Sequence, residues 1–305
     1  MAVPSSGVLS LAGIRAELAT NTYNASATTT SSLEDLSDGT VATINTGNAS
    51  GDRPDGNTPH AMSEFYAYDH DLSSFNDNIS FDLDGANDYL EGAGNLANAI
   101  SVSTGSISTW IKIDSHSANG LIWAINTEEG STDQIFLLYH NSVGKVRANF
   151  KGGNTSNLAD SSSGLENDGN WHHFVVTWQA QAKASGNIVK LYEDGSLVDS
   201  DAIGSVFSGS PAIFGFGRNA IQNFGQNFNG HLNDMAIFDD VLTSSEVSAI
   251  YNSGAPKDES SHSGIISYYT LEGYSDSDET VADDSSNSHA LTINNSTNID
   301  STDTP

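Results

Sequence analysis

Apolar and polar residues alternate in short runs from Ile79 onward, the period of two that is typical of β-strands. In the run 107–113 the isoleucines share one face and Trp110 lies on the other, so both faces of this strand are expected to be buried. Runs of this kind occur at residues 79–83, 107–113, 121–125, 135–139, 145–150, 172–178, 188–192, 212–216 and 232–238. Their spacing, with turn-rich gaps, predicts an all-β chain of two antiparallel sheets packed as a sandwich.

The run 171–178 and the run 189–193 are predicted to form a hairpin whose second strand ends in the tight Asp194-Gly195 turn. The doublet His172-His173 lies on the first strand, where neighbouring side chains point to opposite faces. These two histidines therefore cannot chelate one ion from the same side, and packing or hydrogen bonding is the expected role of both.

Residues 1–72 have a different pattern, which predicts a small irregular and helical module. Ser10 is placed to cap a short helix that reaches Leu18, with Leu11, Ile14 and Leu18 on one stripe. A stretch rich in Ser, Thr, Asn and Gly follows, and a second short helical pattern covers residues 62–68. This is little apolar surface for an independent core, so the segment is expected to fold against a partner or a neighbouring subunit.

Charge narrows the classes of partner. The chain has 10 Lys and Arg against 39 Asp and Glu, a formal charge of −29, and such a surface repels nucleic acid. Two interpretations stay open: solubility in a salty medium, or binding of divalent cations by carboxylates and carbonyl groups. There is no cysteine, which excludes disulfides and thiolate metal sites.

No apolar run approaches the roughly 20 residues that cross a bilayer, so membrane insertion is not expected. The first residues do not combine a basic region with an apolar one, so a secretory signal is expected to be either absent or already removed.

Several blocks closely resemble the laminin-G-like, concanavalin A-like jelly rolls over about residues 78–254. They are the hairpin WHHFVVTW…VKLYEDG, FDLDGANDYLEG (81–92), ISVSTGSISTWIKID (100–114) and FNGHLNDMAIFDDVLTSSEVSAIYNSG (228–254). The resemblance implies a concanavalin A-like jelly roll that binds rather than catalyses. In the last block Thr243 and Glu246 form a capping-box pattern at the start of a helix.

The expected domains are an attachment module at 1–72, a laminin-G-like sandwich at 73–256 and an acidic segment at 257–305. That last segment has ten acidic residues and one basic residue. It resembles an edge strand that usually precedes the rest of the family's sandwich. Either the sandwich is permuted and closed by its C-terminal segment, or another, truncated sandwich begins there.

Residues 1–72 resemble the N-terminal regions of virion and tail-associated proteins of phages, especially marine ones. The resemblance depends on VPSSGVLSLAGIRAEL (3–18) and PHAMSEFYAYDH (59–70). It implies a small module that attaches the chain to the particle. An ordinary flexible leader is the alternative.

Catalytic carboxylates are not found in the pattern that hydrolases of this fold use. Endoglucanases with this sandwich carry E-x-D-x-x-E on one strand for retaining hydrolysis. Glu166 and Asp168 come nearest, but Trp171 stands where the third carboxylate belongs. No catalytic residue is assigned, and the chain is predicted not to be an enzyme.

Two candidate binding sites remain. The resemblance implies Ca²⁺ at the rim of the sandwich, where the candidate ligands are Asp84, Asn87, Asp88 and Asp234; an Asx turn without metal is the alternative for the first three. Exposed aromatics in loops favour carbohydrate recognition, which points to Phe224 with Arg218, Asn219 and Asn223. Other aromatics (Trp123, Tyr139, Phe207 and Phe228) are expected mostly in the core.

The favoured hypothesis is a non-enzymatic phage virion protein, such as a capsid decoration, fibre or tail appendage. It would be made in the host cytoplasm, held by residues 1–72 to other virion proteins as a homo-oligomer, and display the sandwich for assembly and attachment to host glycans. The alternative is a secreted bacterial carbohydrate-binding or adhesin module. A glycoside hydrolase or lyase is disfavoured by the missing carboxylates.

Overall fold

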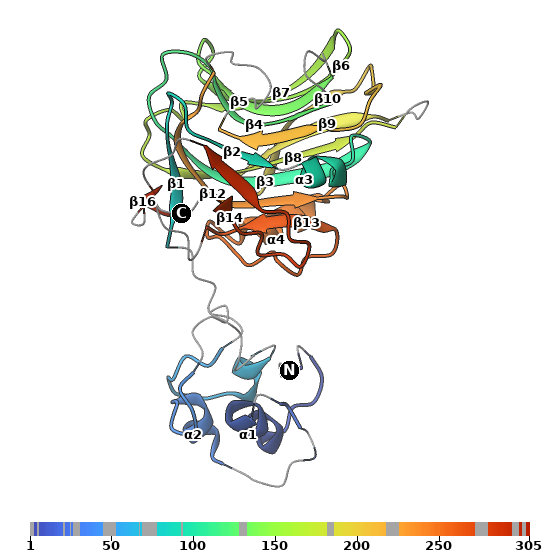
Figure 1. The fold of residues 1–305 in the computed structure, drawn as a ribbon. Helices are drawn as coiled ribbons and strands as arrows, with labels where there is room; N and C mark the ends of the chain where they lie inside the picture. Colours follow the sequence, from blue (N-terminus) through green and yellow to red (C-terminus); the bar gives the residue numbers. More distant parts are fainter. Residues whose placement is uncertain are drawn as a thin grey trace. The chain divides into compact units, whose positions relative to one another are not determined.

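The computed structural model divides into two compact units, residues 1–76 and 77–305 (Figure 1). It describes residues 3–4, 6–20, 22–24, 26, 31–44, 53–66, 68, 78–92, 94–127, 133–181, 186–217, 226–271, 280–294, 299–300 and 303–305. Within these parts of the chain, no helix is both long and apolar enough to cross a membrane.

The N-terminal unit contains α1 (Leu11–Thr20), α2 (Leu33–Ser37) and a 3₁₀ helix (Met62–Phe65). Ser10 caps α1 as predicted, because its Oγ accepts a hydrogen bond of 2.9 Å from the Gly13 N–H. Contrary to the expectation from sequence, this unit has a small core of its own. Its buried apolar residues are Val3, Ile14, Leu18, Leu36, Phe65 and Tyr68.

The second unit is a sandwich of two antiparallel sheets, which confirms the predicted fold class. Sheet A has the order β10-β9-β8-β3-β12-β1-β16, with β13 paired to the far half of β12. Its strands are β10 (Ser196–Ala202), β9 (Ile188–Glu193), β8 (Trp171–Gln179), β3 (Thr104–Ile113), β12 (Asn229–Phe238), β1 (Ser80–Asp84), β16 (Ile299–Asp300) and β13 (Ile265–Tyr269).

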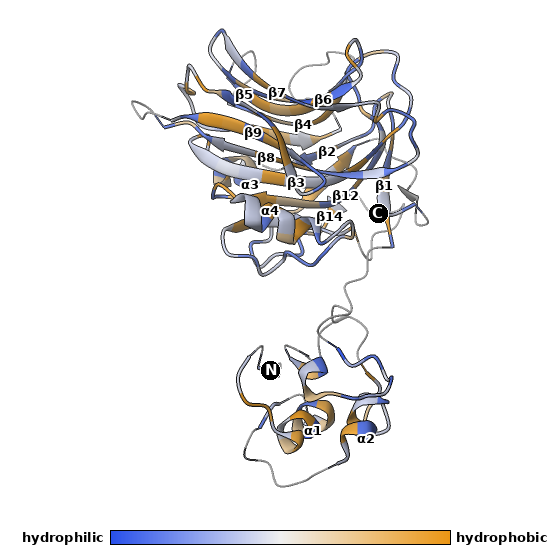
Figure 2. Cartoon of the chain, turned by 180° about the vertical axis from the view of Figure 1, so that it is seen from behind, coloured by the Kyte–Doolittle hydropathy of each residue, from blue (hydrophilic) through white to orange (hydrophobic). Residues whose placement is uncertain are grey.

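Sheet B has the order β14-β15-β2-β11-β4-β5-β6-β7. Its strands are β14 (Thr280–Val281), β15 (Leu291–Asn294), β2 (Tyr89–Gly92), β11 (Ile213–Phe216), β4 (Gly120–Asn126), β5 (Gln134–His140), β6 (Lys145–Gly152) and β7 (Thr155–Ser163). The apolar faces of the two sheets bury one core, to which Trp123, Trp178 and Tyr139 contribute some of the bulkiest side chains. Figure 2 shows the apolar colour along strands such as β9 and on α1.

Part of the outer face of sheet A is buried too, because α4 (Ser244–Tyr251) packs against β3 and β8. The ring of Tyr251 stacks on Trp110 at 5.7 Å between centroids and on His173 at 5.9 Å. Trp110 is 2% exposed, so both faces of β3 are buried as its sequence predicts. The helix begins with the predicted capping box of Thr243 and Glu246. The remaining helix, α3 (Gly94–Ala99), follows β2 and contributes Leu96 to the core.

The C-terminal segment forms part of both sheets. Strands β13 and β16 pair with β12 and β1 in sheet A, whereas β14 and β15 extend sheet B from β2. Residues Tyr269, Leu271, Val281 and Leu291 are buried in the same core as the strands that precede them. Of the two arrangements left open by the sequence, these pairings correspond to a sandwich closed by its C-terminal segment.

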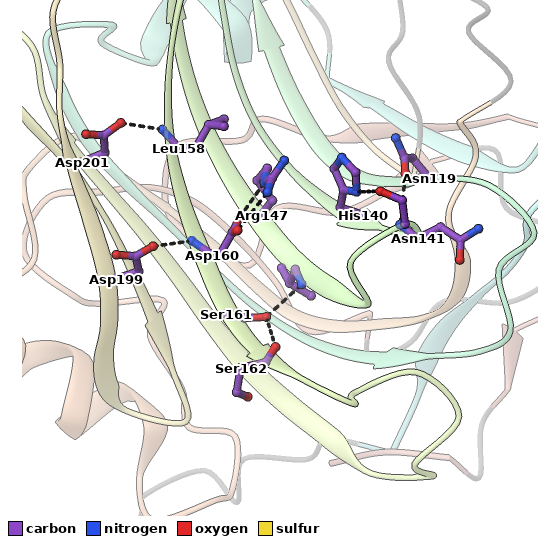
Figure 3. A network of polar contacts seen from close by, with 12 residues as sticks. Asn119, His140, Asn141, Arg147, Leu158, Asp160, Ser161, Ser162, Asp199 and Asp201 are labelled. Atoms are coloured by element: carbon purple, nitrogen blue, oxygen red, sulfur yellow. Dashed lines mark hydrogen bonds and ion pairs between the residues drawn. The ribbon is translucent and has the colours of Figure 1, made fainter.

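The free edges of the two sheets are joined at β7 and β10 (Figure 3). Asp201 Oδ2 accepts from the Leu158 N–H at 3.0 Å, and Asp199 Oδ2 accepts from the Asp160 N–H at 2.9 Å. The other oxygen of each aspartate accepts from the N–H of the following residue on β10, at 2.8 and 2.9 Å. Each carboxylate therefore occupies backbone donors on two edge strands, which an exposed edge would otherwise offer to another chain.

Candidate functional site

A polar cavity of about 180 Å³ lies at one end of the sandwich, where three loops meet. The β1–β2 turn contributes Asp84 and Gly85, the β3–β4 loop contributes residues 115–119, and the approach to β12 contributes Asn227 and Asn229. This is smaller than the roughly 300 Å³ of a drug-sized pocket, so a single sugar unit or a hydrated ion suits it better.

The turn reaches the cavity because of its local sequence. Asp84 Oδ1 accepts from the Ala86 N–H at 2.7 Å, an Asx turn, and Gly85 adopts a left-handed φ of +73°. A Cβ atom at position 85 would lie 2.9 Å from the Asn229 Cβ, so glycine also allows the close approach of turn and strand.

Amide side chains hold the three loops together. The Asn229 Nδ2 donates to the Ser115 carbonyl at 2.9 Å, and the Asn227 Nδ2 donates to the Ala86 carbonyl. Residues that are more than a hundred positions apart thus fix one another's place, which preorganises the polar lining.

Tyr139 and Glu166 lie behind His116, which is part of the cavity lining. Glu166 accepts hydrogen bonds of 2.6 Å from the His116 N–H and from the Tyr139 hydroxyl. These two bonds hold the pKa of Glu166 below its usual range, whereas burial and Glu166 together raise the pKa of Tyr139 to about 12. Burial lowers the pKa of His116, so its ring is neutral where it packs against Phe228.

The turn brings together three of the four predicted calcium ligands. Asp84 and Asn87 are exposed, and Asp88 is 8% exposed with its Oδ2 3.4 Å from the Asp84 backbone nitrogen. Burial, followed by the charge of Asp84, raises the pKa of Asp88. The Asx turn is therefore present, and the carboxylates of Asp84 and Asp88 lie near one another at the same turn.

Asp234 does not belong to this cluster. On β12 it is Asn229 that pairs with Asp84, and Asp234 lies five positions further along, roughly 17 Å away at the rise of a strand. Its buried carboxylate accepts a hydrogen bond from the Tyr268 hydroxyl instead. Burial, and then the charge of Asp234, raise the pKa of Tyr268.

The predicted carbohydrate-binding residues Phe224, Arg218, Asn219 and Asn223 lie outside the described residues. Trp123, Tyr139 and Phe228 are fully buried, and Phe207 packs against the core. The residues that the sequence analysis missed are Asn227, Asn229 and the 115–119 loop. Their only sequence signal is a polar run after a strand, which is common to most loops.

Comparison with known proteins supports the architecture. Residues 84–248, more than half of the chain, match the family model of the concanavalin A-like lectin/glucanases superfamily. A putative carbohydrate binding protein from Bacteroides ovatus is similar in structure, with a TM-score of 0.54 and 18% identity. The match covers 76% of this chain and 62% of the Bacteroides protein, so the chain corresponds to less than two thirds of that relative.

Two further structures are similar at lower TM-scores. The SAP-like pentraxin from Limulus polyphemus has a TM-score of 0.43 at 16% identity, over 57% of this chain and 82% of that one. The Ruminococcus gnavus IT-sialidase CBM40 has a TM-score of 0.44 at 16% identity, over 57% and 96%. Comparison with curated protein sequences finds no match. By the match over residues 84–248, the chain belongs to the concanavalin A-like lectin/glucanase superfamily.

Proposed function

We propose that the chain is a non-catalytic carbohydrate-binding protein whose ligand enters the polar cavity at the end of the sandwich. The observation that carries this proposal is the convergence of three tied loops, lined by amide, hydroxyl and carboxylate groups, on a lectin-type sandwich. Such groups match the alternating donors and acceptors of sugar hydroxyls.

The carboxylates nearest to the glucanase pattern support binding without catalysis. A glycosidase acid needs a carboxyl group whose pKa is raised, so that it carries a proton to donate. The pKa of Glu166 is lowered by its hydrogen bonds from His116 and Tyr139. Burial raises the pKa of Asp168, but the hydrogen bonds from His172 and Asn170 outweigh this and lower it overall. Both groups are ionised acceptors.

A glycan array with the purified chain tests this function. Ala118→Trp fills the cavity without removing a hydrogen bond between the loops. Ala255→Trp, in an exposed loop after α4, is the matched control. We expect the native chain and Ala255→Trp to bind the same glycans and Ala118→Trp to lose them. Full binding by Ala118→Trp, or no glycan bound by the native chain, would contradict the proposal.

We propose Ca²⁺ as a cofactor of the same end of the sandwich, held by Asp84 and Asp88. The raised pKa of Asp88 reflects burial and repulsion by Asp84, which a divalent cation would relieve. Calcium should then raise the melting temperature of the native chain and have no effect on Asp88→Asn. A native melting curve that is the same in calcium and in a chelator would argue for the metal-free Asx turn.

For the setting, we propose a virion component, such as a capsid decoration, fibre or tail appendage. The separate unit 1–76, with its own small core, supports an attachment role distinct from the sandwich. Other virion proteins would bind this unit, and a homo-oligomer in the particle would display several sandwiches to host glycans, so that weak single contacts add up.

Locating the chain in purified particles by electron microscopy tests the setting. Density for the sandwich on a capsid or tail, with residues 1–76 at its base, is the expected result. Secretion by an uninfected bacterium would favour the alternative, a secreted carbohydrate-binding or adhesin module, and would leave the glycan-binding proposal unchanged.

A further inference from the structure

The start of β8 and the end of β9 bring one histidine and two carboxylates close together. Ligand atoms of His172, Glu193 and Asp194 all lie within 4.8 Å of one another. Within the described parts of the chain, no other group of at least three His, Cys, Asp or Glu side chains meets this distance. Asp168 adds a third carboxylate, on the opposite side of the His172 ring.

The two ring nitrogens of His172 contact different carboxylates. Nε2 lies 2.9 Å from Asp168 Oδ2, and Nδ1 lies 3.0 Å from Asp194 Oδ2. A carboxylate that accepts from one ring nitrogen orients the ring and leaves the other nitrogen to ligate an ion, the usual outer shell of a metal-bound histidine. Asp168 is itself held in place by the Asn170 N–H at 2.8 Å.

The two acidic ligands are also held by groups that would not touch the ion. The His173 N–H donates to Asp194 Oδ1 at 2.9 Å, which leaves Oδ2 for the His172 side. The Ser162 N–H donates to Glu193 Oε2 at 2.8 Å, and the Ser162 hydroxyl donates to Oε1. Ser162 on β7 therefore holds the Glu193 carboxylate, and the backbone of β8 holds the Asp194 carboxylate. Such supporting hydrogen bonds preorganise the ligands of a binding site.

Distance and charge agree with a small divalent ion. Metal bonds of about 2.0–2.1 Å in a tetrahedral zinc site put neighbouring ligand atoms roughly 3.3 Å apart, close to the 3.0 Å between His172 Nδ1 and Asp194 Oδ2. Three carboxylates facing one imidazole leave an excess of negative charge whether or not the ring is protonated. The side chains of His172, Asp168 and Asp194 are 15%, 24% and 35% exposed, so an ion can reach them.

We infer that His172 Nδ1, Asp194 and Glu193 form a binding site for a divalent transition-metal ion, with zinc as the ion that this donor set suits best. Mixed imidazole and carboxylate donors select zinc and its neighbours over calcium, which takes oxygen ligands alone. The site is separate from the cavity of the 115–119 loop, and it requires neither the glycan ligand nor Ca²⁺. In the absence of metal, a proton takes its place between His172 and Asp194.

Titration calorimetry of the full chain with zinc chloride tests the site, after treatment with a chelator and in the presence of excess Ca²⁺. We expect one zinc ion per chain to bind much more tightly than any others, and Co²⁺ to give the visible absorption of a four- or five-coordinate ion at the same stoichiometry. Absence of a single tight equivalent, or its displacement by Ca²⁺, would overturn the inference.

Three variants and a control locate the ion. His172→Gln and Glu193→Gln should each remove the tight equivalent, and Asp168→Asn should weaken it by about 10- to 100-fold, as loss of an outer-shell partner does. His140→Gln changes a histidine that lies beside Ser142 and should bind zinc as the native chain does. Melting curves in chelator check that each variant folds. If His172→Gln does not fold, Glu193→Gln tests the site in its place. Zinc binding that survives Glu193→Gln unchanged would sink the assignment.

Discussion

His172 and His173 are neighbours in sequence, but their surroundings give them different protonation states. Hydrogen bonds to Asp194 and Asp168 outweigh the effect of burial and raise the pKa of His172 to about 9. His173 is fully buried beneath Tyr251, where loss of water lowers its pKa to about 3. Its Nε2 lies 2.7 Å from the Ser108 hydroxyl. The doublet therefore contributes one charged and one neutral ring, each on its own face of β8.

This difference predicts a pH-dependent contribution of His172 to stability. Its folded pKa is above the unfolded value near 6.5, so the stabilisation is complete below about pH 6 and is lost as the pH rises through about 9. His172→Gln should therefore lower the free energy of unfolding by at most about 3 kcal/mol at pH 6, and by little at pH 10. Urea unfolding across this range, in a chelator and with His140→Gln as control, measures it. An equal loss at both pH values would assign the effect to packing.

Single residues also mark how far sequence could predict the candidate site. The Asp84-Gly85 turn can be predicted from sequence, because the Asx turn and the positive φ of Gly85 depend on neighbouring residues alone. Asn227 and Asn229 carry no such signal, since their role depends on contacts with Ala86 and Ser115 more than a hundred residues away. The wrong assignment of Asp234 to the calcium site has the same cause. The local sequence does not show that Asp84 pairs with Asn229, five positions before Asp234.

Among the elements, two of the strands that apolar alternation did not locate, β7 and β10, are polar. The alternation of apolar residues located β3, β5 and β8, each of which has a buried face. By contrast, β7 and β10 are rich in Ser, Asp and Asn, and β10 is mostly exposed. Their strand conformation depends on pairing with β6 and β9 and on the carboxylates of Asp199 and Asp201. Hydrophobic periodicity does not report such contacts.

The joined edges give a prediction for β10. Replacing Asp199 and Asp201 by alanine leaves the N–H groups of Leu158 and Asp160 without their carboxylate acceptors. Each lost hydrogen bond should cost about 0.5–1.5 kcal/mol, and the freed edges should promote association. Urea unfolding and light scattering measure the two effects. Ser200→Ala, at an exposed site on the same strand, should change neither stability nor association. If the Asp199→Ala, Asp201→Ala double variant is as stable and as monomeric as Ser200→Ala, the edges do not need these acceptors.

For the molecule as a whole, the two units should differ in what their removal does. A chain of residues 77–305 retains every strand of both sheets, and it should keep the native melting temperature of the sandwich and its glycan binding. A chain that ends at residue 256 lacks β13 and β15, together with Tyr269 and Leu291 of the core, and it should not fold cooperatively. Thermal melting of both truncations, followed by circular dichroism, tests these expectations. A cooperative transition in the chain that ends at residue 256 would show that the C-terminal strands are dispensable.

The net charge of −29 predicts a stability that rises with salt. At 0.01 M salt the Debye length is about 30 Å and repulsion acts across the molecule, whereas at 1 M it is about 3 Å. The melting temperature of the native chain should therefore increase by several degrees between these conditions. Sodium chloride and potassium chloride should act alike; a flat or falling curve would mean that local ion pairs such as Arg147–Asp160 outweigh the overall repulsion.

The pairing of β1 and β2 has a consequence for the order of events during synthesis. Although they follow one another in the chain, β1 belongs to sheet A beside β12 and β16, and β2 belongs to sheet B beside β11 and β15. Tyr89 meets Asn294, a partner translated 205 residues later. The first strands to leave the ribosome must therefore wait, unpaired, for most of the chain to be made. Folding that depends on such distant partners is slow, and the waiting strands are where a chaperone would be needed most.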